Sequence, residues 1–172
     1  MEKIGYRAFW GTKIKSVTLP ASLTTTVSSG GDEGQGPFAN TLLEAVIFAD
    51  GTKEIPAYVL LGAENVINVN IPQTAGRLGY RAFEGMSSLK SLYIPSSVIT
   101  FGNRVFENHA SDFVIYGEAG SAAEKYAKEN NIEFRAATKP KLDPPTANPT
   151  PGVIPPITQI TFILPISGAK IY

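Results

Sequence analysis

Short apolar blocks recur along the chain and predict a repeating structure. Within each block, apolar residues alternate with other residues at a period of two, which is typical of a strand that buries one face. The middle apolar positions are Val17, Val46, Val69, Leu92 and Phe113, and their partners two residues on are Leu19, Phe48, Ile71, Ile94 and Ile115. The intervals between successive blocks are 29, 23, 23 and 21 residues, so we expect one strand in each repeat.

A second block precedes four of the five strands and completes the repeat, while the glycine-rich segment 28–37 stands in its place before the strand at 43–49. Residues 4–9 read IGYRAF and residues 78–83 read LGYRAF, while FGNRVF at 101–106 and IPAYVL at 55–60 fit the same template. These small residues with one large apolar residue suit a short turn or helix that closes a coil. A period near 23 lies in the range of leucine-rich repeats. One coil cannot bury its own apolar face, so we expect about five coils to stack into a solenoid.

The longer first interval and the end of the repeats each have their own signature. The glycine-rich segment 28–37 accounts for the extra residues in the first interval. At the other end, Ser121 and Glu124 have the spacing of a capping box and predict the start of a helix. Ile132 and Phe134 then predict a closing strand. We expect this segment, about 117–135, to form an α-helical cap at the C-terminal end of the solenoid.

Prolines divide the chain into two parts. Eight of the thirteen prolines lie in residues 138–172, which predicts an extended proline-rich linker after a repeat domain at 1–137. The apolar, β-branched stretch 157–172 is expected to begin a further, truncated module. Because the chain starts within three residues of a repeat block, we also expect it to be cut from a longer array.

Composition excludes several classes of function. The chain carries 15 basic and 15 acidic residues, which gives no support to nucleic-acid binding, and it has no cysteine for a disulfide or a thiolate metal site. A single histidine predicts no transition-metal site, and we expect no cofactor. The sequence shows neither a secretory signal nor an apolar run long enough to span a membrane. We expect a monomer.

Two short segments invite a catalytic or phosphate-binding interpretation. His109, Ser111 and Asp112 are the residue types of a hydrolase triad, but triad members normally come from separate parts of a chain. We therefore expect a solvated turn there and no enzyme activity. The glycine-rich residues 30–36 lack the Gly-Lys-Ser/Thr end of a phosphate-binding loop, and their acidic residues lack the spacing of a calcium loop.

The repeats resemble the BspA-type leucine-rich repeats of bacterial surface proteins. IGYRAFWGTKIKSVTLPASL and LGYRAFEGMSSLKSLYIPSSV match that family's pattern, and IYGEAGSAAEKYAKENNIEF at 115–134 looks like its C-terminal cap. The resemblance implies a right-handed coil with short parallel strands. It also implies a cell-surface or secreted adhesin that binds a host or bacterial surface protein or a glycan. The alternative is a structural spacer that presents another domain on the cell surface.

The outward side of the predicted strands is the candidate binding face, because a solenoid offers its strand face as an extended surface. Tyrosine among asparagine and serine is a composition favoured in recognition patches. The alternative is an exposed face that tolerates mixed residues. The predicted binding residues are Thr18, Asn68, Asn70, Ser91, Tyr93 and Asp112, and the outward positions between them include Ser16, Ala45, Ile47 and Val114.

Overall fold

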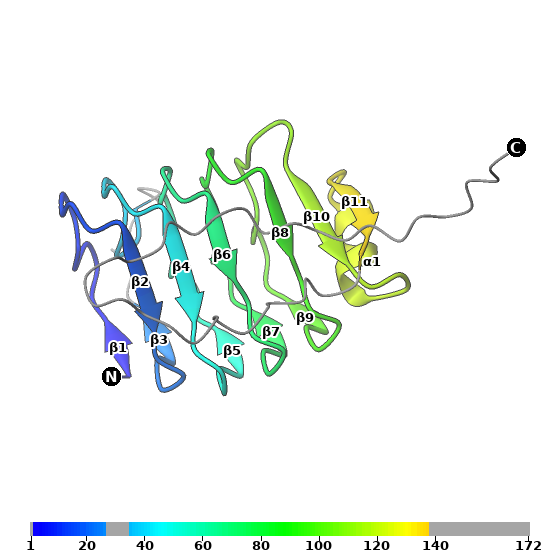
Figure 1. Ribbon diagram of the computed structural model, residues 1–172, viewed down its shortest axis with the longest axis horizontal. Helices are drawn as coiled ribbons and strands as arrows, with labels where there is room; N and C mark the ends of the chain where they lie inside the picture. Colours follow the sequence, from blue (N-terminus) through cyan, green and yellow to red (C-terminus); the bar gives the residue numbers. More distant parts are fainter. Residues whose placement is uncertain (1, 27–34, 138–172) are drawn as a thin grey trace, which may run out of the picture.

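The computed structural model describes residues 2–26 and 35–137, which form a parallel β-solenoid of about five turns (Figure 1). Each coil passes along one long strand and returns through a shorter strand on another side of the stack. The long strands are β2 (Ser16–Leu19), β4 (Ala45–Phe48), β6 (Asn68–Asn70), β8 (Ser91–Tyr93), β10 (Val114–Gly117) and β11 (Glu133–Ala136). The short strands are β1 (Lys3–Ile4), β3 (Thr25–Thr26), β5 (Glu54–Ile55), β7 (Arg77–Leu78) and β9 (Thr100–Phe101), and the helix is α1 (Ala122–Glu129).

The register of the first three long strands confirms the predicted apolar column. Val17 pairs with Val46, and Val46 pairs with Val69, in parallel ladders. These valines point into the stack, because the strand alternates its side chains between two faces. The strand repeat read from the sequence is therefore the structural repeat of these coils.

The register predicted for the last repeat is wrong by two residues. Leu92 pairs with Ile115, not with Phe113, and Tyr93 pairs with Tyr116 instead of Val114. Phe113 instead occupies a turn before the strand, where its N–H donates to the Ala110 carbonyl over 3.0 Å. Leu89 makes the same bond to Met86 in the preceding coil. Phe113 is therefore the counterpart of Leu89, and its burial comes from that turn position.

The sequence predicted a short turn or a helix for the block before a long strand, and the structure has a turn there. Short paired strands come directly before these turns. The strands β5, β7 and β9 form one parallel sheet, and β1 pairs with β3. Successive coils approach closely here: a Cβ on Gly79 would lie 2.4 Å from the Ala57 nitrogen, and one on Gly102 would lie 2.6 Å from the Tyr80 nitrogen. Glycine is thus required at Gly79 and Gly102, because the backbone of the preceding coil fills the space that a Cβ would need.

Aromatic rings from these turns, and Phe48 from β4, stack along the core. The ring of Phe83 lies parallel to that of Phe106 at a centroid distance of 5.3 Å and meets Phe48 edge-on at 6.4 Å. Phe9 and Phe38 stack at 4.8 Å in the first two coils. All but Phe9 are fully buried, so the aromatic residue of each block ties neighbouring coils together.

The predicted helix is present and starts at the predicted residue. Ser121 is its N-cap, and the Ser121 hydroxyl accepts a hydrogen bond from the Glu124 N–H at 3.4 Å. The Glu124 carboxylate reaches back one residue further than expected and accepts from the Gly120 N–H at 2.7 Å. The helix packs against β10 and β11 at the end of the stack opposite β1 (Figure 1). The predicted linker at 138–172 and most of the glycine-rich segment lie outside the described residues.

Candidate binding face

The outward side chains of the long strands form one surface, which we call the strand face. Two residues per strand contribute to it, because side chains alternate along each strand. Most of them are exposed or half-buried, whereas Val46, Leu92 and Ile115 between them are buried. The strand face consists of Ser16, Thr18, Ala45, Ile47, Asn68, Asn70, Ser91, Tyr93, Val114, Tyr116, Glu133 and Arg135.

Five of the six predicted binding residues lie on the strand face. Thr18 and Asn70 are exposed, and Asn68, Ser91 and Tyr93 are half-buried. They come from β2, β6 and β8. The fold therefore gathers the polar residues of β6 and β8, which are separated by 23 residues in the sequence, at the middle of the stack.

The sixth predicted residue, Asp112, does not lie on the strand face. It is exposed in the turn before β10, and its carboxylate accepts a hydrogen bond from the Lys90 ammonium at 2.6 Å. The bond to Lys90 holds the pKa of Asp112 below its ordinary value. The error in the predicted register accounts for this misplacement, since Val114 occupies the position assigned to Asp112.

The sequence prediction missed three residues of the strand face, Tyr116, Glu133 and Arg135. Tyr116 pairs with Tyr93 on one side and with Arg135 on the other. A hydrogen bond with the carboxylate of Glu133, followed by one with Tyr116, raises the pKa of Arg135. A strict 23-residue interval from Asn70 through Tyr93 leads to Tyr116, so the signal was present in the spacing.

The Tyr93 hydroxyl is a buried polar group on this face. Its oxygen is inaccessible to solvent and makes no hydrogen bond, although the Gln73 side chain lies close enough to lower its pKa. Burial, followed by the charge of Glu118, outweighs this effect and raises the pKa of Tyr93 above its ordinary value. Tyr93 is therefore neutral at physiological pH, and its half-buried side chain is held among neighbouring side chains.

The hydrogen-bonded sheet is interrupted between β6 and β8, at the centre of the strand face. The strand β6 ends one three-stranded sheet and β8 begins the next, although the two strands lie side by side. No ladder pairing joins Asn68–Asn70 to Ser91–Tyr93 within the described residues. The middle of the strand face thus combines polar side chains with main-chain amides that belong to no shared ladder.

Several charged groups near the strand face are paired. Lys15 forms an ion pair with Glu44 across two coils, and the guanidinium of Arg135 lies 2.8 Å from the carboxylate of Glu133. The Lys90–Asp112 pair lies in the turns that lead into β8 and β10. The centre of the face, formed by β6, β8 and β10, carries no formal charge on its outward side chains.

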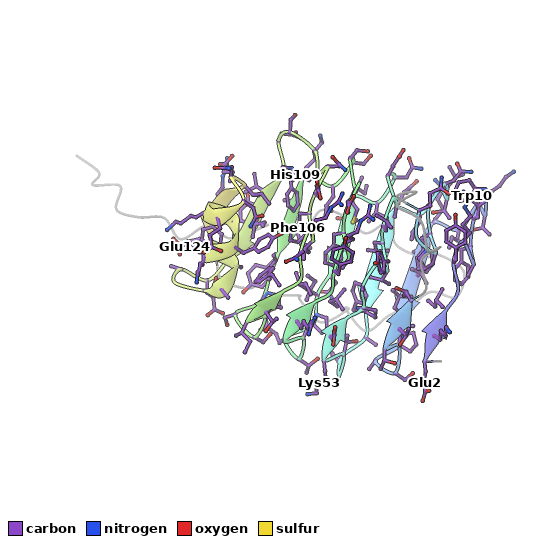
Figure 2. All side chains as sticks on the ribbon, turned by 180° about the vertical axis from the view of Figure 1, so that it is seen from behind. Glu2, Trp10, Lys53, Phe106, His109 and Glu124 are labelled. Atoms are coloured by element: carbon purple, nitrogen blue, oxygen red, sulfur yellow. The ribbon has the colours of Figure 1, made fainter. Side chains whose placement is uncertain are left out.

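The His109 region is a turn without a triad-like arrangement. Nδ1 of His109 lies 2.6 Å from the Ala110 carbonyl oxygen, and its ring lies 5.4 Å from that of Phe113. Asp112 bonds to Lys90, while Ser111 is exposed. His109 lies at the same edge of the stack as Trp10, opposite Lys53 and Glu2 (Figure 2).

The described residues contain no group of three or more His, Cys, Asp or Glu side chains that could hold a metal ion. Among these residues, no helix has the length and apolar character to cross a membrane. A groove of about 410 Å³ lies between the last coil and α1, with Arg104 and Tyr126 in its lining. Arg104 is paired with Glu107, so this groove offers no unpaired guanidinium to a ligand.

Two solved structures are partly similar to this chain. A leucine rich cell surface protein from Faecalibacterium prausnitzii A2-165 is 15% identical with a TM-score of 0.41, and the match covers 67% of this chain. The pneumococcal vaccine antigen PcpA is 19% identical with a TM-score of 0.45, and the match covers 62% of this chain. The matched regions span 42% and 31% of those two chains. A search of curated proteins finds no significant match.

The family comparison agrees with the repeat structure. The model of the BspA type leucine rich repeat region matches residues 1–112, with six copies of the repeat. This match contains the strands β1 to β9 and their turns, which are the coils described above. The chain belongs to the BspA type leucine rich repeat family.

Proposed function

We propose that this chain is a non-catalytic interaction and adhesion module of a bacterial cell-surface or secreted protein. It binds a macromolecular partner, a surface protein or a glycan, through the strand face. The observation that carries this proposal is the row formed by Asn70, Tyr93 and Tyr116 at one position of three successive coils. Rigid aromatic side chains among adaptable polar groups are typical of recognition surfaces.

The architecture supports the use of this face. Among the described residues, no helix lies over the long strands, because α1 packs at the end of the stack (Figure 1). The repeat family to which the chain belongs also favours a binding module over an enzyme. A solenoid whose strand face carries no helix within residues 2–26 and 35–137 has an extended surface there for a large partner.

We extend the proposal to the organisation of the chain. Residues 1–137 form the binding domain, and α1 with β11 closes the stack as an end cap. Tyr126 of α1 supports this role, since its ring stacks on Phe101 at 4.4 Å and meets Phe106 at 6.0 Å. Residues 138–172, which hold eight of the thirteen prolines, serve as a linker.

The test is binding of the full chain to arrays of matrix proteins, bacterial surface proteins and glycans. The double variant Asn70→Ala/Tyr93→Ala should lose at least about tenfold in affinity, because central aromatic residues dominate binding energy. His109→Ala is the matched control and should bind like the natural chain. If the double variant loses no more affinity than His109→Ala, the binding site lies away from the strand face. If the chain binds no partner on the arrays, the alternative function as a structural spacer is favoured.

A further inference from the structure

We propose that the ligand of the strand face is a neutral, extended glycan of β-1,4-linked hexose units that lies across the long strands. This inference rests on the proposed function and names the partner class of the same face. It is carried by the charge, the hydrogen-bonding groups and the spacing of the outward side chains at the centre of that face.

The charge of the face fits a neutral ligand. The outward side chains of β6, β8 and β10 carry no formal charge, and Lys90 beside them is paired with Asp112 at 2.6 Å. At the β11 edge, Arg135 is paired with Glu133 at 2.8 Å. A sulfated glycan or a nucleic acid would need free cations along its path. The negative charge of Glu118, which raises the pKa of Tyr93, would also repel a polyanion.

The chemical groups of the face match those of a sugar. Asn68 and Asn70 each offer an amide that both donates and accepts hydrogen bonds, which suits pairs of neighbouring hydroxyls. Ser91 adds a hydroxyl that can act in either role. Tyr93 and Tyr116 are half-buried neighbours in register and provide apolar rings for the C–H faces of hexose units. Because these rings are already held by their surroundings, binding costs little side-chain entropy.

The spacing of the strands matches the repeat of such a chain. Neighbouring strands of a sheet lie about 5 Å apart, which is close to the length of one hexose unit in an extended β-1,4-linked glycan. Asn70, Tyr93 and Tyr116 occupy one position in three successive coils. A glycan that runs along the axis of the stack would therefore place one unit over each of the paired strands β8 and β10, and the next unit over β6, which lies beside β8 without a ladder.

A protein partner is less well matched to this centre. Protein interfaces depend on a desolvated apolar core that is surrounded by a polar rim. Here the polar residues stand at the centre, and Val114, the aliphatic residue among them, is only 8% exposed. The exposed aliphatic side chain of the strand face, Ile47, lies on β4 beside Asn70, outside the Tyr93–Tyr116 pair. These features favour the glycan.

The experiment is calorimetric titration of the full chain with cellohexaose, mannohexaose and chitohexaose, together with their disaccharides. At least one hexasaccharide should bind, with an affinity at least about tenfold above that of its disaccharide, since the longer chain spans more strands. Tyr93→Ala should weaken binding about tenfold or more, and Tyr93→Phe should stay within about threefold because the ring is kept. His109→Ala should bind like the natural chain.

The outcomes separate this inference from the proposed function. Failure of all three hexasaccharides to bind, or equal binding by Tyr93→Ala, overturns the glycan assignment. If a protein partner instead binds in a Tyr93-dependent way, the proposed function stands and the inference fails. If neither glycan nor protein binds through Tyr93, both fail. Tighter, salt-sensitive binding of a heparin fragment would also contradict a neutral ligand.

Discussion

Tyr116 lies directly beside Tyr93 in the parallel register of β8 and β10, and the two hydroxyls have opposite environments. No side chain meets hydrogen-bond geometry with the buried Tyr93 hydroxyl, although Gln73 lies beside it, whereas Tyr116 accepts a hydrogen bond from the guanidinium of Arg135. The tyrosine hydroxyl therefore lowers the stability of the fold at position 93 and raises it at position 116. This pair provides a direct comparison of the two effects on one face.

Replacing Tyr93 with Phe should raise the free energy of unfolding by about 1 kcal/mol, because it removes a buried polar group without a partner. Replacing Tyr116 with Phe should lower it by about 1 kcal/mol, because a hydrogen bond to a charged group is lost. Urea denaturation of the two variants measures both changes. A loss of stability in Tyr93→Phe equal to that in Tyr116→Phe would show that the Tyr93 hydroxyl has a partner.

Replacing Gly79 with Ala should destabilise the solenoid by about 2–3 kcal/mol, because the new Cβ would meet the Ala57 backbone. Gly5 holds the same place in the first block, yet no atom lies within 4 Å of a Cβ built there. Gly5→Ala is therefore the matched control and should change the unfolding free energy by less than about 0.5 kcal/mol. Thermal denaturation compares the stabilities of the Gly79→Ala and Gly5→Ala variants. Equal destabilisation in both would refute the close approach of the coils at Gly79.

The ion pair between Arg81 and Glu84 is almost completely buried, with both side chains about 5–6% exposed. Glu84→Ala leaves the guanidinium of Arg81 buried without this carboxylate and should cost about 3–5 kcal/mol. The double variant Arg81→Met/Glu84→Leu removes both charges and should recover most of that loss. Denaturant unfolding measures both proteins. A double variant as unstable as Glu84→Ala would show that the charge pair itself is required.

The carboxylate of Glu124 should contribute to acid sensitivity. Hydrogen bonds from Lys128 and from the Gly120 N–H hold its pKa below the ordinary value of 4.5. A carboxyl group with a lower pKa in the folded state stabilises that state above the ordinary pKa, and the contribution is lost as the pH falls through the folded value. Unfolding free energy measured from pH 7 downward should therefore fall less steeply below pH 4.5 in Glu124→Gln. An identical acid slope in both proteins would contradict this assignment.

The sequence was sufficient to predict the long strands and the start of the helix. Apolar alternation with a 23-residue period identifies Val46 and Val69 as stacked neighbours, because a one-residue slip would expose them. The capping-box spacing of Ser121 and Glu124 identifies Ser121 as the N-cap of the helix. Alternation does not set the register of the last coil, since Phe113 is as apolar as a strand residue but fills a turn.

Other features depend on contacts between coils and could not be predicted from local patterns. The strands β5, β7 and β9 have only two residues each, too few to show a period. Arg81 and Tyr58 adopt left-handed backbone with φ of 52° and 61°, where local rules favour glycine or asparagine. Their N–H groups donate to carbonyls of the next coil, at Asn103 and Tyr80, and such bonds hold the unfavourable conformation.

The most direct test of the strand face as the binding surface is chemical-shift mapping of the isotopically labelled full chain. The ligand added is whichever hexasaccharide or protein binds in the titrations. The account predicts that the largest amide shifts fall at 68–70, 91–93 and 114–116, the strands that carry Asn70, Tyr93 and Tyr116. Shifts confined to 99–104 and 122–130, around the groove beside α1, would contradict it.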